Sequence, residues 1–195
     1  MFTLSHNLIL GSKSPRRQEL IKGMGFMYEI RTLDTDESYP DSLVGADVAG
    51  YLATQKADAL LPSLQENELL LTSDTVVIIE GEVLGKPVNE QEAIAMISKL
   101  SGKTHQVITG VHLATLQQRN TFSVTTEVVF HSLTTEEINY YIQMYKPFDK
   151  AGSYGIQEWI GYIGIEKMNG SYYNVMGLPT AELWQQLRQL GYIQS

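Results

Sequence analysis

The chain has 195 residues, of which 43% are hydrophobic, so it fits one domain with a full hydrophobic core. It contains no cysteine, which excludes disulfide scaffolds, thiolate metal sites and a cysteine nucleophile. The net charge of −8 disfavours nucleic acid as a partner, and no apolar run approaches the ~20 residues that cross a bilayer.

The first informative stretch combines a strand with the start of a helix. Residues 8–10 are apolar and predict a short buried strand. Ser14 followed by proline predicts a helix over residues 15–22, with the serine as N-cap and proline at the first helical position. Gly23 is expected to form the turn at its C-terminal end.

Three cations, Lys13, Arg16 and Arg17, flank the start of this helix. They lie at the positive end of the helix dipole, where each is expected to cost roughly 0.3–1 kcal/mol unless an anion is nearby. Backbone N–H groups at a helix N-terminus and arginine guanidinium groups both bind phosphate. The stretch therefore predicts either a phosphate site or an ordinary solvated helix start, and local chemistry leaves both open.

A second strand and a second helix follow. Residues 26–31 predict a strand, and the acidic residues 34–38 predict a loop. Residues 46–61 predict a helix that ends at Pro62. Its apolar stripe, with a spacing of four, includes one lysine: Val48, Leu52, Lys56, Leu60. Lys56 is either a lysine that extends to solvent along an apolar face or a cation directed into a site.

A polar segment interrupts the apolar residues 68–79. The flanking residues predict a central, buried strand, with Thr72-Ser73-Asp74-Thr75 in its middle. A carboxylate in such a place is unfavourable unless it is paired, protonated or bound to a metal. Asp74 therefore indicates a site, and the alternative is a loop between two strands with Asp74 solvated at its tip.

A hairpin is predicted after this segment. Glu80-Gly81 is typical of a two-residue turn, and residues 83–84 return as a strand. The hairpin would bring Lys86 back towards Asp74. The alternative for Lys86 is an exposed turn lysine, as for any single lysine.

Several common motifs are excluded. Residues 89–100 predict a capped helix, and Ser101-Gly102-Lys103-Thr104 behind it ends like a phosphate-binding P-loop. However, Ile97 stands where that motif requires glycine, and a P-loop follows a strand, not a helix. No serine stands on a nucleophile elbow. Four histidines show no zinc-ligand spacing: His6, His105, His112, His131.

The second half of the chain predicts strands, helices and one polar loop. Residues 106–116 and 121–130 predict strands, and Thr134 with Glu137 predicts a capped helix. The stripe of that helix is expected in the core: Ile138, Tyr141, Ile142, Tyr145. Residues 149–157 are polar with two glycines, which indicates either a tight loop near a ligand or a plain connector.

The last elements complete the predicted fold class. Residues 159–168 and 171–176 predict a hairpin around Asn169-Gly170, and residues 179–190 predict a closing helix. Strands and helices therefore alternate, with hairpins among them. This order predicts an α/β or α+β fold with a mixed sheet.

Five of these stretches, taken in order, resemble the Maf family of nucleoside triphosphate pyrophosphatases: Ser12-Lys13-Ser14-Pro15-Arg16-Arg17, Ser73-Asp74-Thr75-Val76-Val77, Gly85-Lys86-Pro87, Leu100-Ser101-Gly102-Lys103-Thr104-His105, and residues 149–157. The resemblance spans nearly the whole chain. It implies an α/β fold with a mixed, elongated sheet and flanking helices that form two lobes around a cleft, related to the inosine triphosphate pyrophosphatases. It also implies a single domain over residues 1–195 and a homodimer.

The resemblance implies roles for particular residues. Asp74 matches the catalytic acid and, with Glu37, the metal-binding carboxylates, although Asp36 is an alternative to Glu37. The phosphate-binding set corresponds to Ser12, Arg16, Arg17, Lys56 and Lys86. The positions tied to base selectivity correspond to Arg16, Thr75 and Gln157. Gly155-Ile156-Gln157 resembles the branch that acts on dTTP and UTP, and Ser73 departs from the alanine that is common there.

The implied reaction is hydrolysis of a nucleoside triphosphate to the monophosphate and pyrophosphate, with a divalent metal. Mg²⁺ is the first choice, because one or two carboxylates plus phosphate oxygens suffice to bind it, and Mn²⁺ and Co²⁺ are alternatives. Asp74 is either the proton acceptor or only a metal ligand. A cytoplasmic location is expected, since the N-terminus shows no signal peptide. The alternative function is a non-catalytic, nucleotide-binding regulator of cell division.

Overall fold

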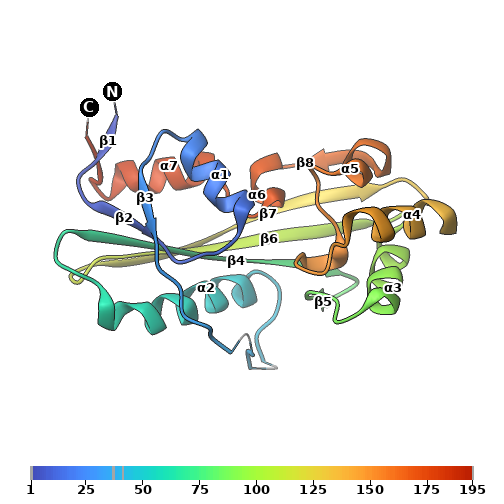
Figure 1. Cartoon of the computed structure of the whole chain (residues 1–195), viewed down its shortest axis with the longest axis horizontal. Coiled ribbons are helices and arrows are strands. Elements are labelled where there is room, and N and C mark those ends of the chain that lie inside the picture. The colour runs from blue at the N-terminus through green and yellow to red at the C-terminus, as the bar shows by residue number, and fades with distance from the viewer. Residues whose placement is uncertain (1, 37, 41, 195) are drawn as a thin grey trace. The chain divides into compact units, whose positions relative to one another are not determined.

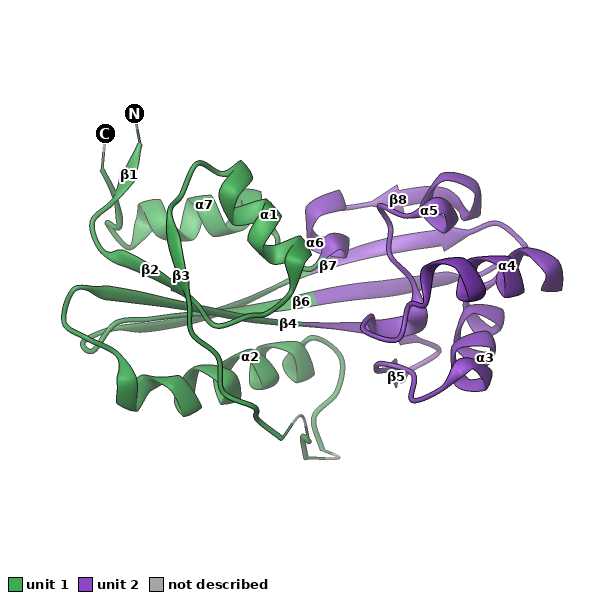
Figure 2. Ribbon diagram, viewed as in Figure 1, with its two compact units in different colours: residues 1–74, 109–124, 177–195 green, residues 75–108, 125–176 purple. Residues whose placement is uncertain are grey.

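The computed structural model describes residues 2–36, 38–40 and 42–194. The chain divides into two compact units, which Figure 2 shows in different colours. Unit 1 contains residues 1–74, 109–124 and 177–195, and unit 2 contains residues 75–108 and 125–176. None of the helices in the described part of the chain is long and apolar enough to cross a membrane.

A mixed sheet is the framework of the fold. Its strands, in order across the sheet, are β3 (Tyr28–Ile30), β2 (Asn7–Leu10), β4 (Glu68–Ile79), β6 (Thr104–Ala114), β7 (Arg119–Phe130) and β8 (Ile165–Asn169). A further strand, β5 (Glu82–Leu84), pairs with β4. Three of its strands have residues in both units: β4 (Glu68–Ile79), β6 (Thr104–Ala114) and β7 (Arg119–Phe130). Parallel pairs of β2 with β3 and β4, and antiparallel pairs of β5 with β4 and β8 with β7, make the sheet mixed.

Unit 1 surrounds the parallel part of the sheet. Its further elements are β1 (Thr3–Leu4), β2 (Asn7–Leu10), α1 (Pro15–Gly23), β3 (Tyr28–Ile30), α2 (Ala46–Leu60), the 3₁₀ turn η1 (Leu61–Ser63), α7 (Thr180–Gln189) and β9 (Ile193–Gln194). In this unit α1 and α7 cover one face of the sheet and α2 covers the other (Figure 1). β1 and β9 form an antiparallel pair beside both termini.

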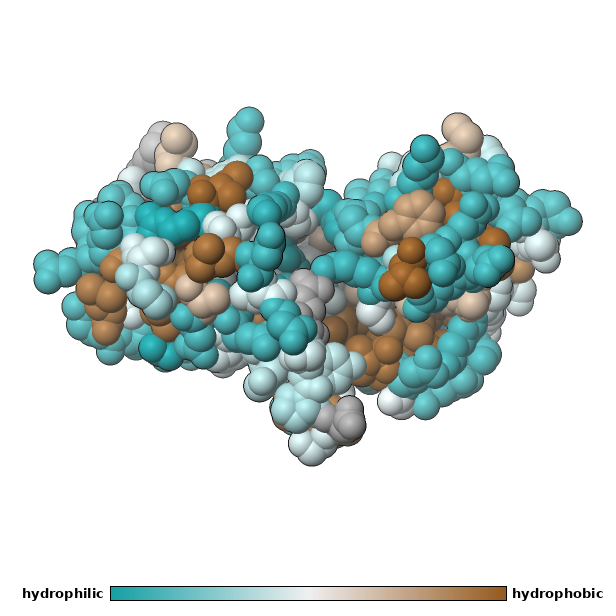
Figure 3. Space-filling model, turned by 60° about the horizontal axis from the view of Figure 1, so that its bottom comes forward, coloured by the Kyte–Doolittle hydropathy of each residue, from teal (hydrophilic) through white to brown (hydrophobic). Residues whose placement is uncertain are grey.

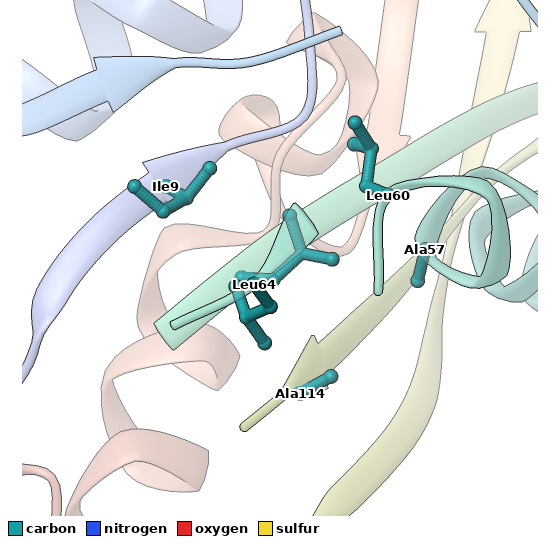
Figure 4. Packing of buried hydrophobic residues seen from close by; sticks show 6 residues of the cluster. Ile9, Ala57, Leu60, Leu64 and Ala114 are labelled. Atoms are coloured by element: carbon teal, nitrogen blue, oxygen red, sulfur yellow. The ribbon is translucent and has the colours of Figure 1, made fainter. Parts of the chain in front are cut away.

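The core of unit 1 forms where α2 packs on the sheet. Figure 4 shows the cluster, which joins β2, β4 and β6 to α2 and the segment after it: Ile9, Ala57, Leu60, Leu64, Leu70, Ala114. All are at least nine-tenths buried. The apolar runs of β2 and β4 are those expected of strands covered on both faces.

Unit 2 is built on the second half of β4 and on β7. Its further elements are β5 (Glu82–Leu84), α3 (Glu90–Leu100), α4 (Thr135–Tyr145), the 3₁₀ turn η2 (Ala151–Ser153), α5 (Trp159–Gly164), β8 (Ile165–Asn169) and α6 (Tyr172–Met176). α3 packs against α4 and against η2. The helix starts agree with their caps, since Asn89 and Thr134 each accept a hydrogen bond from the third residue of their helix.

Several predicted elements are confirmed. β4 is one continuous strand, so the alternative of a loop around Asp74 is wrong. The turn at Glu80-Gly81 has φ angles of 52° and 82°, as a two-residue hairpin turn requires. The capping box of Thr134 and Glu137 is complete, because each side chain accepts from the other residue's backbone N–H.

Three predictions about local structure are wrong. The turn after α1 has its positive φ at Gly25 (83°), so Gly23 is still helical. Ser14 occupies the N-cap position but makes no capping hydrogen bond through its side chain. Residues 159–176 do not form a hairpin: α5 precedes β8, which pairs with β7, and α6 follows. The side chain of Asn174 in α6 donates to Val107 O and Thr126 Oγ1, which fixes this segment as a helix on the sheet.

The surface is mixed in character. On the face shown in Figure 3, hydrophilic residues cover most of the surface and hydrophobic residues gather in several patches. Scattered exposed apolar side chains of this kind are usual in globular proteins. The predicted arrangement of two lobes around a cleft stays a prediction.

Candidate functional site

A largely buried ion pair joins two elements of unit 1. Asp74 lies on β4 and Lys56 on α2, and the Lys56 ammonium donates to Asp74 Oδ1. The two side chains are only 12% and 16% exposed. Lys56 therefore does not extend to solvent along its helix, and its partner explains how β4 keeps a carboxylate among buried neighbours.

Two contacts hold α2 over the strands and so place Lys56. Thr72, two residues before Asp74 and on the same side of β4, donates its hydroxyl proton to Ala53 O at 2.6 Å. On β6, Gly110 lies so close to α2 that a Cβ built on it would overlap the Ala49 carbonyl. The absence of a side chain at Gly110 allows the helix backbone to approach the sheet.

The N-terminus of α1 brings Ser12 and Arg17 together. Ser12 Oγ accepts from Ser14 N (3.2 Å) and from Arg17 Nη1 (3.4 Å), while Arg17 Nε donates to Gly177 O at 2.9 Å. The first turn contains no acidic residue, and the N-cap side chain makes no capping bond. Arg16 lies in the same turn. The positive end of this helix dipole thus lacks an acidic residue of its own.

The acidic loop beside α1 is described only in part. Glu37, the predicted second metal-binding carboxylate, lies outside the described residues. Both carboxylate oxygens of Asp36 accept hydrogen bonds from Ser38, through its N–H (3.0 Å) and its hydroxyl (2.9 Å). Gln55, next to Lys56, donates to Ser38 O at 3.4 Å and so ties the loop to α2.

In unit 2, residues 149–157 contact the segment that carries Lys86. Gly152 N donates to Gly85 O at 3.0 Å. Gly152 has a φ of 66°, and a Cβ on it would lie 2.9 Å from Val77, so the loop packs closely on β4. Thr75 follows Asp74 on the same strand and is half-buried, while Lys86 is exposed. Residues 149–157 thus form a tight loop, as predicted, and its proximity to a ligand stays a prediction.

Gln157 lies in a tight turn at the end of this loop. Glu158 N donates to Gly155 O at 3.0 Å, which makes Gln157 the third residue of a four-residue turn. Gln157 Oε1 is buried and has no hydrogen-bond partner among the described residues. A buried acceptor of this kind is unfavourable unless a ligand supplies the missing donor.

Three residues that the sequence analysis did not assign to the site support this turn. Tyr141 Oη donates to Glu158 and accepts from Gly155 N at 3.0 Å. Lys150 Nζ lies 3.1 Å from Glu158 Oε1 and donates to Asp149 at 2.7 Å. Burial and the neighbouring Glu158 carboxylate raise the pKa of Tyr141, so its hydroxyl keeps its proton. Tyr141 lies on the apolar stripe of α4, so its spacing predicts a core residue and does not reveal the polar contacts of its hydroxyl.

The described donors fit a magnesium-type ion bound mainly by phosphate. No group of three or more His, Cys, Asp or Glu side chains that could hold a metal occurs in the described ranges. Asp74 is a single buried carboxylate on β4, and Mg²⁺ needs only one or two carboxylates when phosphate oxygens and waters complete its shell.

Comparison with known proteins gives consistent matches. The family model described as "Maf-like protein" matches residues 7–190. A dTTP/UTP pyrophosphatase of Phocaeicola vulgatus is 53% identical over 186 residues, or 95% of this chain and 96% of the relative. A dTTP/UTP pyrophosphatase of Bacteroides thetaiotaomicron is 50% identical over the same length and the same shares.

A solved structure shows the same fold at low sequence identity. The Ham1 protein of Staphylococcus aureus matches with a TM-score of 0.51 and 13% identity, over 92% of this chain and 99% of that chain. The mixed α/β fold class is therefore confirmed. The predicted site residues fall into two groups, one in each unit: Ser12, Arg16, Arg17, Lys56 and Asp74 in unit 1, and Thr75, Lys86 and Gln157 in unit 2.

Proposed function

Because the chain belongs to the Maf family, we propose that it hydrolyses nucleoside triphosphates, dTTP and UTP first, to the monophosphate and pyrophosphate. The observation that carries the proposal is the position of Asp74, a buried carboxylate on a strand that Lys56 holds in place. Hydrolysis of a triphosphate requires a carboxylate held in this way. Relatives at 53% and 50% identity bear the name dTTP/UTP pyrophosphatase, which supports the choice of nucleotide.

We propose that residues 1–195 form a single nucleotide pyrophosphatase domain. We expect Ser12, Arg16 and Arg17, at the N-terminus of α1, to bind the phosphates. Lys56 and Lys86 are expected to add further positive charge. Fixed cations of this kind stabilise the charge that develops on a leaving pyrophosphate.

The chemistry needs one charged carboxylate and one water. The oxygen of the water attacks the α-phosphorus, the bond from that phosphorus to the bridging oxygen breaks, and pyrophosphate leaves. Asp74 either accepts the proton of the attacking water or serves only as a metal ligand, and both roles depend on its negative charge. Lys56 holds the carboxylate in position through its hydrogen bond to Oδ1.

We propose that Asp74 and Glu37, together with phosphate oxygens, hold the divalent metal, with Mg²⁺ first and Mn²⁺ or Co²⁺ as alternatives. When bound, the metal supplies charge neutralisation and a lower pKa for a bound water.

Base selection is proposed to depend on Gln157, with Arg16 and Thr75. The Gln157 amide can both donate and accept, which suits the mixed donor and acceptor edge of uracil or thymine. Its buried Oε1 has no partner among the described residues and so can accept from the ring N3–H. We also propose a homodimer, which the family resemblance supports, and a location in the cytoplasm.

The test is pyrophosphate release by the full chain from dTTP, UTP, CTP, ATP and GTP, with Mg²⁺ and with EDTA. We expect turnover of dTTP and UTP above the others, and its loss in EDTA. Tight binding of dTTP without pyrophosphate release would instead favour the non-catalytic regulator of cell division. Equal turnover of all five nucleotides would contradict the proposed base selection.

A further inference from the structure

We propose that Tyr141 is a positioning residue for base recognition: its hydroxyl ties both ends of the turn at residues 155–158 to α4 and thereby holds the Gln157 amide in place. The inference rests on the proposed function, because it gives Tyr141 its purpose through Gln157. Tyr141 itself touches neither substrate nor metal in this proposal.

The turn is closed from two directions. Its own backbone bond joins Glu158 N to Gly155 O at 3.0 Å. The Tyr141 hydroxyl then accepts from Gly155 N at 3.0 Å and donates to the Glu158 carboxylate. One oxygen atom therefore bonds the first and the last residue of the turn, and Gln157 lies between them.

The support for this oxygen is rigid. Tyr141 is fully buried, at 0% exposure, and sits in the middle of α4, whose N-terminus carries a complete capping box. Its ring stacks on Tyr145 with centroids 5.2 Å apart. A hydroxyl on a packed helix is a firmer anchor than a loop contact, because the packing restricts its rotamer.

The charge on Glu158 strengthens the hydroxyl bond. Lys150 lies 3.1 Å from Glu158, and the two side chains are only 9% and 18% exposed. A hydrogen bond that a hydroxyl donates to a charged carboxylate is roughly twice as strong as a neutral one. Lys150 therefore acts on the turn through Glu158.

The side chains of the turn pack tightly around Gly155. A Cβ built on Gly155 would lie 2.9 Å from the Glu158 carboxyl carbon and 3.1 Å from Gln157 Nε2. The amide and the carboxylate thus lie against the same glycine. Gln157 Oε1 remains buried and without a partner among the described residues, oriented by contacts that do not use it.

The experiment is a double-mutant cycle on the full chain with Tyr141→Phe, Gln157→Ala and both together. The readout is kcat and KM for dTTP, UTP and CTP. We expect Tyr141→Phe to lower kcat/KM for dTTP and UTP roughly 3- to 10-fold, mainly through KM, with a smaller change for CTP. In the Gln157→Ala background Tyr141→Phe should add nothing, because it acts through the lost amide.

The matched control is Tyr145→Phe, which removes a hydroxyl from the exposed neighbour on the same helix and should leave all three nucleotides unchanged. Glu158→Gln is the second variant, in case Tyr141→Phe folds poorly. It keeps the size of the side chain but loses the charge, and it should shift selectivity in the same direction. Hydrogen exchange should also be faster at the Gly155 amide in Tyr141→Phe.

The outcomes separate the two proposals. If the wild type released no pyrophosphate from dTTP or UTP, the proposed function would fall, and the exchange rate at Gly155 would still decide whether Tyr141 holds the turn. If the wild type is active but the two losses add, or all nucleotides fall equally, Tyr141 is only structural and the inference is overturned.

Discussion

Single residues on β4 show how a strand can keep polar side chains in its buried middle. Thr72, Ser73 and Asp74 are all buried, in a segment where apolar residues would pack more favourably. Thr72 has a backbone acceptor and Asp74 has Lys56, whereas Ser73 Oγ has no partner among the described residues. The three residues therefore differ in what each contributes to stability and to chemistry.

Asp74→Asn is expected to abolish pyrophosphate release, by at least about 100-fold, since the amide keeps the shape but loses the charge. The protein should stay folded, because the amide oxygen can still accept from Lys56. Pyrophosphate release and thermal melting of the same preparation check both parts. Asp58→Asn, which removes an exposed carboxylate paired with Arg119, is the control and should retain activity. Substantial activity in Asp74→Asn would refute the catalytic assignment.

Ser73→Ala and Thr72→Val should change stability in opposite directions. Removing the unpaired Ser73 hydroxyl should leave the free energy of unfolding unchanged or raise it by up to about 1 kcal/mol. Thr72→Val should lower it by about 1 kcal/mol, because the 2.6 Å bond to Ala53 is lost. Urea unfolding of both variants measures this. A clear destabilisation by Ser73→Ala would reveal a partner for its hydroxyl.

At the level of elements, the contact between α2 and β6 decides where Lys56 lies. Gly110 lets the helix backbone approach the strand, and Ala49 and Ala53 on that side of α2 are fully buried. Because packed interiors are not easily compressed, a group inserted between α2 and β6 would shift the backbone of α2 and its side chains with it. The ion pair with Asp74 therefore depends on a residue that has no side chain.

Gly110→Ala should lower the free energy of unfolding by about 1–3 kcal/mol, because the new methyl group overlaps the backbone of α2. It should also reduce pyrophosphate release as Lys56 shifts. The control is Gly23→Ala, at a helical position with nothing near the added Cβ, which should be neutral or stabilise by about 0.5–1 kcal/mol. Chemical denaturation measures both. Wild-type stability in Gly110→Ala would mean that α2 can move away at no cost.

For the whole molecule, buried histidines set the response to acid. His105 is 2% exposed, and its Nε2 lies 2.7 Å from the hydroxyl of Tyr154. Burial lowers the pKa of His105 to about 4 and lowers that of His112 as well. An unfolded histidine titrates near pH 6.5, so below that pH the unfolded chain binds protons that the folded chain does not.

Stability should therefore be full above about pH 6.5 and fall as the pH drops towards 4, with His105 accounting for about 3 kcal/mol at the lower end. Glu68, whose pKa is lowered by Arg31, loses its contribution only at more acidic pH. Urea unfolding from pH 7.5 to 4.5 checks this. His105→Gln should make the free energy of unfolding depend less on pH, whereas the substitution of an exposed histidine, His131→Gln, should not. Equal slopes in all three proteins would count against His105.

Most local elements and the family could be predicted from the amino-acid sequence. The apolar runs of β2 and β4, the turn at Glu80-Gly81 and the capping box at Thr134 depend on neighbours along the chain, and short-range chemistry decides them. The same holds for the motif residues around Ser12 and Asp74, because a motif is a pattern in one dimension.

The contacts between side chains that are distant in the sequence could not be predicted, because they depend on how the elements pack. The spacing of Lys56 and of Tyr141 places each on the apolar stripe of its helix. In the structure, however, Lys56 forms an ion pair with Asp74, and the Tyr141 hydroxyl donates to Glu158. Residues 159–176 form a helix, a strand and a helix instead of the predicted hairpin. The reason is that β8 pairs with β7 and that the Asn174 side chain donates to a buried backbone acceptor. Such contacts join residues far apart in the chain, and their free energy appears only when the packed elements bring them together.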